Sequence, residues 1–355
     1  MKTGPILLTS EDAETLLSME ACLEALEVAF RDLASGDAVN RPRTDTFTRS
    51  ANDDTFYRYK SMEGLVPSFG VMALRINSEK IRWPVINGKK RQDKFQRTYP
   101  NHYVGIVLLF SIETGELLAV IKEAYLQKMR VGGTTGLAIK YLSRNNAGRI
   151  GMLGSGWQAG AQLEAACAVR EIEHIKVYSP NADNCKRFAG VMTDKLQVPV
   201  APVKSPEQAA TEVDILLAAT SAMEPVLSGD WIKPGMHVSA INPRREVETT
   251  TLAKSDYIVV NTRDIGYLIY VAGSKAGVAP LEKKEADVSV YPALSEVIAG
   301  KARGRRSQEE KTLFLNNIGL GTQFAAVGAK IYQAAARRGI GQEIPAHWFL
   351  ETVRK

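Results

Sequence analysis

A glycine-rich turn is the stretch of this sequence with the clearest chemistry. It follows the apolar residues 150–153 and reads Gly154, Ser155, Gly156, Trp157, Gln158 and Ala159. With a helical run after it and an apolar run at 175–178, its G-x-G-x-x-A spacing is typical of a dinucleotide-binding βαβ unit. Gly154 permits a tight turn, and Gly156 lets backbone amides approach a pyrophosphate at the N-terminus of a helix. We predict that the first five residues contact the cofactor; a turn that only connects two elements is the alternative.

The end of the second apolar run indicates which dinucleotide the turn would hold. An NAD site usually has Asp or Glu there, which accepts a hydrogen bond from the ribose 2′-hydroxyl. In this sequence the first carboxylate after Tyr178 is Asp183, whereas Ser179 and Asn181 can donate to a 2′-phosphate and Lys186 follows one helical turn later. The sequence therefore favours NADP(H) over NAD(H), which stays possible. The alternative for Lys186 is a solvated helix face.

Composition limits the class of protein. The chain has 355 residues, of which 45% are hydrophobic and 24% charged, as in an ordinary globular protein large enough for two domains. Its net charge of +6 fits attraction of small anions better than nucleic-acid binding. No apolar run is long enough to span a membrane, and the first residues do not form the apolar core of a signal peptide. Three cysteines without C-x-x-C spacing indicate a reducing, cytoplasmic setting, and no metal-ligand spacing occurs.

The elements that must position the turn alternate along the chain. Strand-like runs at 199–203, 214–219, 237–241 and 257–261 are separated by helical runs. This alternation predicts an α/β fold with a Rossmann-type, doubly wound parallel sheet. Cofactor and substrate should then meet at the carboxyl ends of its strands. We predict that Thr220 and Ser221 contact the cofactor there, and that Asn242 contacts the substrate.

The residues before the turn predict a second, mixed unit. The expected elements are a helix over 10–35 capped by Ser10, strands at 56–60 and 71–76, a hairpin of strands 104–110 and 117–121, and a helix over 127–143 with Arg130 at its start. The basic residues 81–103 read as a long loop, either solvated or a lid over an anionic site. Residues 303–311 are expected to be exposed, and a last helix through Tyr332 to return to this unit.

Several segments resemble the ornithine cyclodeaminase/μ-crystallin family, in order, along nearly the whole chain. They are Pro42-Arg43, the strand ending at Arg75, the hairpin G-I-V-L-L-F-S-I-E-T-G-E-L-L-A, residues 126–134, the L-G-S-G-W-Q-A turn, A-I-N-P-R-R-E-V and residues 318–320. The resemblance implies a homodimer with a central Rossmann domain, 127–312, and an α+β substrate and dimerisation domain built from 1–126 and 313–355. It also implies NAD(P)-dependent chemistry at the α-carbon of amino acids.

The resemblance also implies site residues. Family members hold the substrate carboxylate with arginines that match Arg43 and Arg130, and planar guanidinium groups suit a bidentate grip. The small residues that follow, Gly132, Gly133 and Thr134, are expected to leave room for that carboxylate. The family usually has a lysine at Arg75, and a guanidinium does not readily exchange a proton as that lysine can.

Acidic residues of the cyclodeaminases are missing here. Their aspartate after the strand 237–241 is replaced by the segment that starts at Asn242, and their Glu-Asp pair by Gln323-Phe324. These losses, together with the added arginines, indicate a substrate more negatively charged than ornithine.

The resulting hypothesis is an NADP(H)-dependent imine reductase or amino-acid dehydrogenase. The substrate carboxylate would lie on Arg130 and Arg43, and Lys60, its neighbour Arg58 or a water molecule would protonate the imine nitrogen. Arg75 is expected beside the reacting atoms, and Glu123 either reaches the site or is solvated. Two alternatives stay open: a cyclodeaminase that recycles its NAD within each turnover, and a non-catalytic protein that binds a small ligand with NADP.

Overall fold

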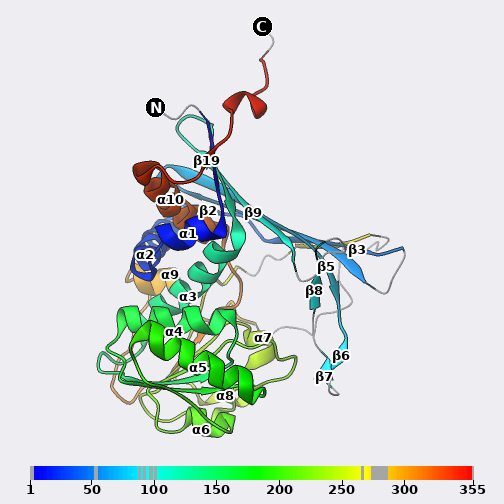
Figure 1. Ribbon diagram of the computed structural model, residues 1–355. Helices are drawn as coiled ribbons and strands as arrows, with labels where there is room; N and C mark the ends of the chain where they lie inside the picture. Colours follow the sequence, from blue (N-terminus) through cyan, green and yellow to red (C-terminus); the bar gives the residue numbers. More distant parts are fainter. Residues whose placement is uncertain are drawn as a thin grey trace.

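Two large β-sheets dominate the computed structural model, which describes residues 4–51, 55–86, 89–90, 93–95, 99, 102–264, 268–272 and 287–353. One sheet has ten strands and the other has seven. Figure 1 shows the ten-stranded sheet above, with the helices α1, α2 and α10 on one of its sides, and the seven-stranded unit below them.

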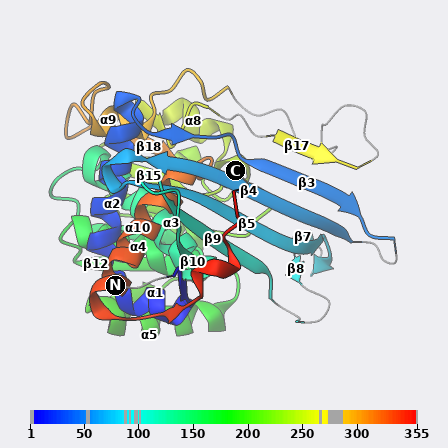
Figure 2. The same cartoon turned by 90° about the horizontal axis from the view of Figure 1, so that it is seen from above.

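The ten-stranded sheet is built from both ends of the chain. Its main path runs β17-β3-β4-β5-β9-β10-β1-β19, with β2 beside β4 and β8 beside β5. The strands are β1 (Ile6–Leu8), β2 (Val39–Asn40), β3 (Thr44–Arg49), β4 (Phe56–Val66), β5 (Val71–Arg82), β8 (Asp93–Phe95), β9 (Val104–Ser111), β10 (Leu117–Lys122), β17 (Leu268–Val271) and β19 (Gln342–Glu343). The antiparallel pairing of β9 with β10 confirms the predicted hairpin. Seen from above, these strands cross the molecule side by side (Figure 2).

Side chains alternate strictly between the two faces of this sheet. Along β5, the odd-numbered residues from Val71 to Ile81 are buried and the even-numbered residues are half-buried. Near the start of β5 the buried face is apolar, with Val71 and Ala73, whereas further along it carries Arg75, Asn77 and Glu79. Because both ends share one face, the strand leads from an apolar core into a charged region.

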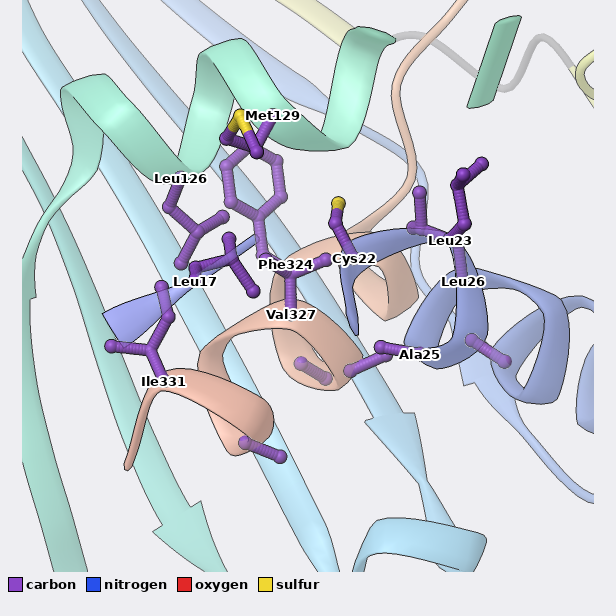
Figure 3. Packing of buried hydrophobic residues seen from close by; sticks show 14 of the residues in the cluster. Leu17, Cys22, Leu23, Ala25, Leu26, Leu126, Met129, Phe324, Val327 and Ile331 are labelled. Atoms are coloured by element: carbon purple, nitrogen blue, oxygen red, sulfur yellow. The ribbon is translucent and has the colours of Figure 1, made fainter. Parts of the chain in front are cut away.

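Four helices cover the apolar end of that face. They are α1 (Ser10–Leu16), α2 (Met19–Ser35), α10 (Gly321–Arg338) and α3 (Glu123–Leu142). Figure 3 shows Leu26 of α2, Leu126 and Met129 of α3, and Phe324 and Val327 of α10 meeting in one cluster. The helix predicted over 10–35 is in fact two helices: Thr9, not Ser10, caps the first, and Ser18 caps the second.

The seven-stranded sheet is entirely parallel, as the alternation predicted. Its order is β13-β12-β11-β14-β15-β18-β16. The strands are β11 (Arg149–Leu153), β12 (His174–Tyr178), β13 (Val200–Pro202), β14 (Ile215–Ala218), β15 (His237–Ala240), β16 (Tyr257–Val260) and β18 (Thr312–Leu315). The connecting helices are α4 (Trp157–Val169), α5 (Ala182–Leu196), α6 (Pro206–Ala210), α7 (Pro243–Glu246), α8 (Thr249–Lys254) and α9 (Leu294–Ile298). The order reverses between β11 and β14, which is where such sheets bind nucleotides.

The chain crosses between the two sheets more often than predicted. β17 lies within the range 127–312 but pairs with β3 of the ten-stranded sheet, and β18 extends the parallel sheet to Leu315. The proposed division at 312 and 313 therefore cuts a strand, and the domain limits stay a prediction. The predicted loop 81–103 includes β8 and the short ribbon of β6 (Val85–Ile86) and β7 (Lys89–Lys90); its remaining middle part lies outside the described residues.

Residues 303–311 are only partly exposed: 306–309 are exposed, as expected, and the others are half-buried or buried. Glu310 is buried, and half-buried Arg303 and Arg305 bind it or the neighbouring backbone. Within the described ranges, no helix combines the length and the apolar character needed to cross a membrane. The cytoplasmic location stays a prediction.

Candidate functional site

The glycine turn lies between β11 and α4 at the carboxyl end of the parallel sheet. Gly154 has φ +112°, and a Cβ there would lie 2.3 Å from the carbonyl oxygen of Ala219, so only glycine fits without strain. Gly156 caps α4, and a Cβ built on it meets nothing within 4 Å. Ala159, which lies three residues after Gly156 in α4, is fully buried against the sheet. The turn is therefore tight, and there is open space beside Gly156. Among the described residues, no side chain caps the backbone amides at the start of α4. These features fit the binding of a dinucleotide pyrophosphate.

The residues predicted to select the cofactor lie together at the end of β12. The amide of Gly154 donates a hydrogen bond to the carbonyl of Tyr178 at 2.8 Å, which holds the turn beside Ser179. Asn181 is exposed and uses its side-chain oxygen to cap α5, leaving its amide NH2 to face outward or toward a ligand. Lys186, also exposed, lies in the first turns of the same helix.

A buried glutamate that sequence analysis missed joins the two loops at the carboxyl ends of β14 and β15. One oxygen of Glu246 accepts hydrogen bonds from the amide and hydroxyl of Thr220, at 2.6 and 2.8 Å. Its other oxygen accepts from the amide of Asn242 at 2.8 Å. Burial raises the pKa of this carboxyl, although the amide donors oppose that effect. Glu246 thus fixes Thr220 and Asn242 in place, whereas Ser221 is exposed.

Arg130 is buried in the second turn of α3, not at the start of the helix as predicted. Gln127 accepts from two of its nitrogens at 3.1 and 2.8 Å, Gln323 accepts from the third at 3.1 Å, and the Phe324 ring lies 5.0 Å from its Cζ. Burial, with the nearby charge of Arg75, lowers its pKa to about 9. Within the described part of the chain its partners are neutral, so the guanidinium has no carboxylate of its own.

Arg130 lies at the carboxyl edge of the parallel sheet, because it contacts the loop that follows β18. A Cβ on Gly319 would lie 2.3 Å from one of the terminal nitrogens of Arg130, so that loop packs directly against the guanidinium.

The small residues after Arg130 do not have the role that was predicted for them. A Cβ on Gly132 would lie 2.5 Å from the carbonyl oxygen of Ala161 in α4, and one on Gly133 would lie 2.7 Å from Leu26. They allow helices to pack closely and leave no room for a substrate carboxylate.

Arg75 shares the Phe324 ring with Arg130. Its Cζ lies 5.5 Å from that ring centre, and its Nε donates to a carboxylate oxygen of Glu123 at 2.8 Å. Glu123 is fully buried at the start of α3, so it reaches the site and is not solvated. Arg75 is therefore held as a fixed positive charge.

Arg43 also contributes its charge here. It forms a two-pronged ion pair with buried Asp45, with both hydrogen bonds at 2.8 Å. Its charge, like that of Arg75, lowers the pKa of Arg130. The structure therefore brings the three predicted arginines into one electrostatic group.

Lys60 is buried, and its ammonium nitrogen lies 3.0 Å from Glu79. Arg58 also binds Glu79, so the two candidates on this face of β4 share one carboxylate. Burial, with the charges of Lys94 and Arg58, places the pKa of Lys60 well below its ordinary value. Burial raises the pKa of Glu79, but Lys60, Lys94 and Arg58 outweigh it and lower that pKa to about 2.

Sheet register explains why these charges meet. Asp45, Lys60 and Asn77 lie opposite one another on β3, β4 and β5, and Arg58 lies opposite Glu79. Sequence analysis missed Asp45 and Glu79, although the period of two from Arg75 to Glu79 was the signal that could have found the latter. Among the residues that the structure describes, no hydrogen bond links Asn242 to these arginines, and no His, Cys, Asp or Glu cluster is arranged to hold a metal.

A model of the ornithine cyclodeaminase/mu-crystallin family matches residues 4–339. The chain belongs to this family. It is 30% identical to the alanine dehydrogenase of Archaeoglobus fulgidus over 345 residues, 96% of this chain and 98% of that protein. It is 26% identical to the iminosuccinate reductase of Paracoccus denitrificans over 345 residues, 96% of this chain and 99% of that one.

A solved structure is similar to this chain over nearly its whole length. The Delta(1)-pyrroline-2-carboxylate reductase of Thermococcus litoralis, in complex with NADH and L-proline, is 28% identical with a TM-score of 0.78. The match covers 96% of this chain and 100% of that one. The predicted family and the predicted Rossmann-type fold with a second domain are both confirmed.

Proposed function

We propose that this protein is an NADP(H)-dependent oxidoreductase that reduces the C=N bond of an imino acid, or oxidises the corresponding amino acid in reverse. One observation carries the proposal: buried Arg130 meets only neutral partners within the described residues, at the carboxyl edge of a dinucleotide-binding sheet. A buried cation of this kind is stabilised by an anionic ligand. The related reductases and the dehydrogenase act on small imino or amino acids, which carry such a carboxylate.

Separate residues of the chain would bind the cofactor and the substrate. Gly154, Gly156 and the α4 amides would hold the pyrophosphate, and Ser179 and Asn181 the 2′-phosphate. The bound nicotinamide supplies hydride chemistry at the substrate carbon. Arg130 would hold the substrate carboxylate, with Gln127 and Gln323 fixing its orientation.

Lys60 is the proposed proton donor to the imine nitrogen. Its lowered pKa makes its ammonium a stronger acid than that of a free lysine, which favours donation of the proton. Arg75, paired with Glu123, would act through its fixed charge and not by exchanging a proton. The contacts of Arg43 and Asn242 with the substrate, and of Thr220 and Ser221 with the cofactor, stay predictions.

A screen of NADPH oxidation tests the proposal. The purified protein would be mixed with 2-oxo acids and with ammonia or methylamine, and NADPH absorbance followed. Amine-dependent oxidation supports an imine reductase. Release of ammonia from ornithine without net change in cofactor would instead support a cyclodeaminase, and binding of NADPH without either reaction a binding protein.

We also propose a homodimer through the outer face of the ten-stranded sheet. Figure 1 shows α1, α2 and α10 on the opposite side of this sheet. Apolar side chains on the outer face are half-buried in the single chain, among them Met72, Leu74, Ile106, Leu108 and Phe110. Light scattering at micromolar concentration should give twice the chain mass, and Leu108→Lys should shift it toward one chain mass. A monomer mass for the parent protein would contradict the proposal.

A further inference from the structure

Residues 345–353, which we call the arm, follow β19 and carry large apolar side chains on the surface. Trp348 is 69% exposed, Phe349 48%, Leu350 67% and Val353 88%. Single exposed apolar residues are ordinary on a protein surface, whereas several in one short segment mark a contact with another surface. The match to the family model ends at residue 339, so the arm lies beyond it.

The base of the arm is fixed to the edge of the ten-stranded sheet. β19 pairs with β1, and just after it the amide of Ile344 donates to the carbonyl of Pro5 at 2.8 Å. Beyond this point the amides of Trp348 and Phe349 donate to carbonyls three residues earlier, at 3.1 and 3.0 Å. Among the described residues, no hydrogen bond joins 345–353 to the rest of the chain. The arm is therefore held at its base and is otherwise free of its own subunit.

The arm stands on the outer side of the ten-stranded sheet. Figure 1 shows it rising from β19 on the side away from α1 and α2, and in the view from above it passes in front of β9 and β5 (Figure 2). The exposure of Trp348 and Phe349 shows that these side chains are not packed onto their own sheet. They are available to a partner that approaches this face.

A second copy of the chain is the partner that this position favours. In the homodimer proposed above, the outer faces of two sheets pack together, and packed sheets lie about 10 Å apart. A segment that stands off this face then has to lie against the other copy. Because Trp and Phe side chains each bury about 150–250 Å², the partly exposed pairs of two arms would contribute roughly 400–600 Å². That area is a substantial share of the roughly 1,200–2,000 Å² of a specific interface.

We propose that each arm clasps the other copy of the chain in the dimer, with Trp348 and Phe349 as the anchors. Aromatic side chains are enriched at the centres of interfaces, and a two-fold axis would give both copies the same contact. This inference rests on the proposed homodimer and adds a second contact to its sheet interface.

A photochemical cross-link tests whether the arm reaches the other copy. p-Benzoylphenylalanine would take the place of Trp348, which keeps an aromatic group there, and the irradiated protein would be run on a denaturing gel. We expect a product of twice the chain mass. The matched control carries the same group in place of Val191 on α5, which is 58% exposed and belongs to the parallel-sheet unit, and it should give only the chain mass. A cross-link confined to one chain, or none, from position 348 would overturn the proposal.

The dimer dissociation constant tests whether the arm stabilises the assembly. Fluorescence-detected sedimentation would compare the parent with Trp348→Ser/Phe349→Ser and with a chain that ends at Pro345. Both variants keep β19 and should fold, and both should raise the dissociation constant at least about tenfold, because anchors are lost from both arms. Val191→Ser, which removes an exposed apolar group from the other unit, should leave it unchanged. An unchanged constant in both arm variants would contradict the assignment of the anchors.

Light scattering and the cross-link together separate the arm from the proposed dimer. A parent protein of twice the chain mass that gives no cross-link between copies from position 348 would leave the sheet interface standing and overturn the arm alone. A parent protein of one chain mass would overturn both. NADPH oxidation is measured independently, so neither result decides the proposed reaction.

Discussion

The glycine turn and the charged face of the ten-stranded sheet are built in opposite ways. The turn is made of consecutive residues, and it offers backbone amides and the space left by glycine. The charged face collects single side chains from β3, β4, β5, β8 and α3, which meet only because the strands are in register. A backbone site binds the same group whatever its neighbours are, whereas a side-chain site changes with each substitution. Cofactor binding should therefore be common to the family and the substrate particular to this chain.

Removing the proton donor should give the largest effect on the charged face. Lys60→Met should lower kcat/KM for imine reduction by about 10²–10⁴, the usual contribution of general acid catalysis. Glu79 keeps Arg58 and Lys94 as partners, so the fold should persist. The measurement is a pH profile: in the parent, kcat/KM falls as pH rises through the lowered pKa of Lys60, and in the variant this limb is absent. The same limb at the same pH in the variant would show that another group donates the proton.

Arg130 should come next and should separate the two regions most clearly. Arg130→Ala removes a charge-assisted contact with the substrate, which should cost on the order of 2–4 kcal/mol in kcat/KM. Affinity for NADPH should barely change, because the pyrophosphate lies on the glycine turn. Arg130→Lys should recover only part of the loss, since an ammonium lacks the two-pronged geometry. Near-parental kcat/KM in Arg130→Ala, on the best acid substrate found, would make Arg130 a structural residue.

The two regions also differed in how much the sequence revealed. The turn, its helix and its strands could be predicted because their residues are neighbours, and the parallel sheet followed from the alternation. Arg43, Arg75 and Arg130 could be grouped only through the family resemblance, because no spacing links three distant segments. Asp45 and Glu246 were missed, and Glu123 was left open, for the same physical reason: each is buried by partners that only the folded chain supplies. The helix break before Ser18 was missed because both helices share an apolar pattern.

Acid should weaken the charged face through Glu79. Its pKa is about 2 in the folded protein against an ordinary 4.5, so its contribution to stability is fully present above about pH 4.5 and is lost as pH falls toward 2. The loss should be at most about 3 kcal/mol, the free energy that corresponds to this difference in pKa, because solvent around the partly exposed Lys94 screens part of the interaction. Glu79→Gln should flatten the fall in unfolding free energy across this window. Lys330→Gln on α10, whose partner Glu24 is exposed and lies outside the charged face, is the control. An equally steep fall in Glu79→Gln would assign the acid sensitivity to other carboxylates, such as Asp45.

Cofactor choice should show the smallest effect, at the edge of the glycine turn. Ser179 follows β12 and lies beside the turn because the Gly154 amide binds the Tyr178 carbonyl. Ser179→Asp places a carboxylate where the NADPH 2′-phosphate is expected, and repulsion at a partly exposed site costs about 1–2 kcal/mol. The ratio of NADPH to NADH affinity should therefore fall by roughly five- to thirtyfold and favour NADH, while kcat with the preferred imine stays close to parental. Ser179→Asn, which keeps a donor, is the matched control and should retain the NADPH preference. Calorimetric titration of both cofactors measures the ratio, and tighter NADH binding by the parent protein would contradict the NADP(H) assignment, with no consequence for the arginines.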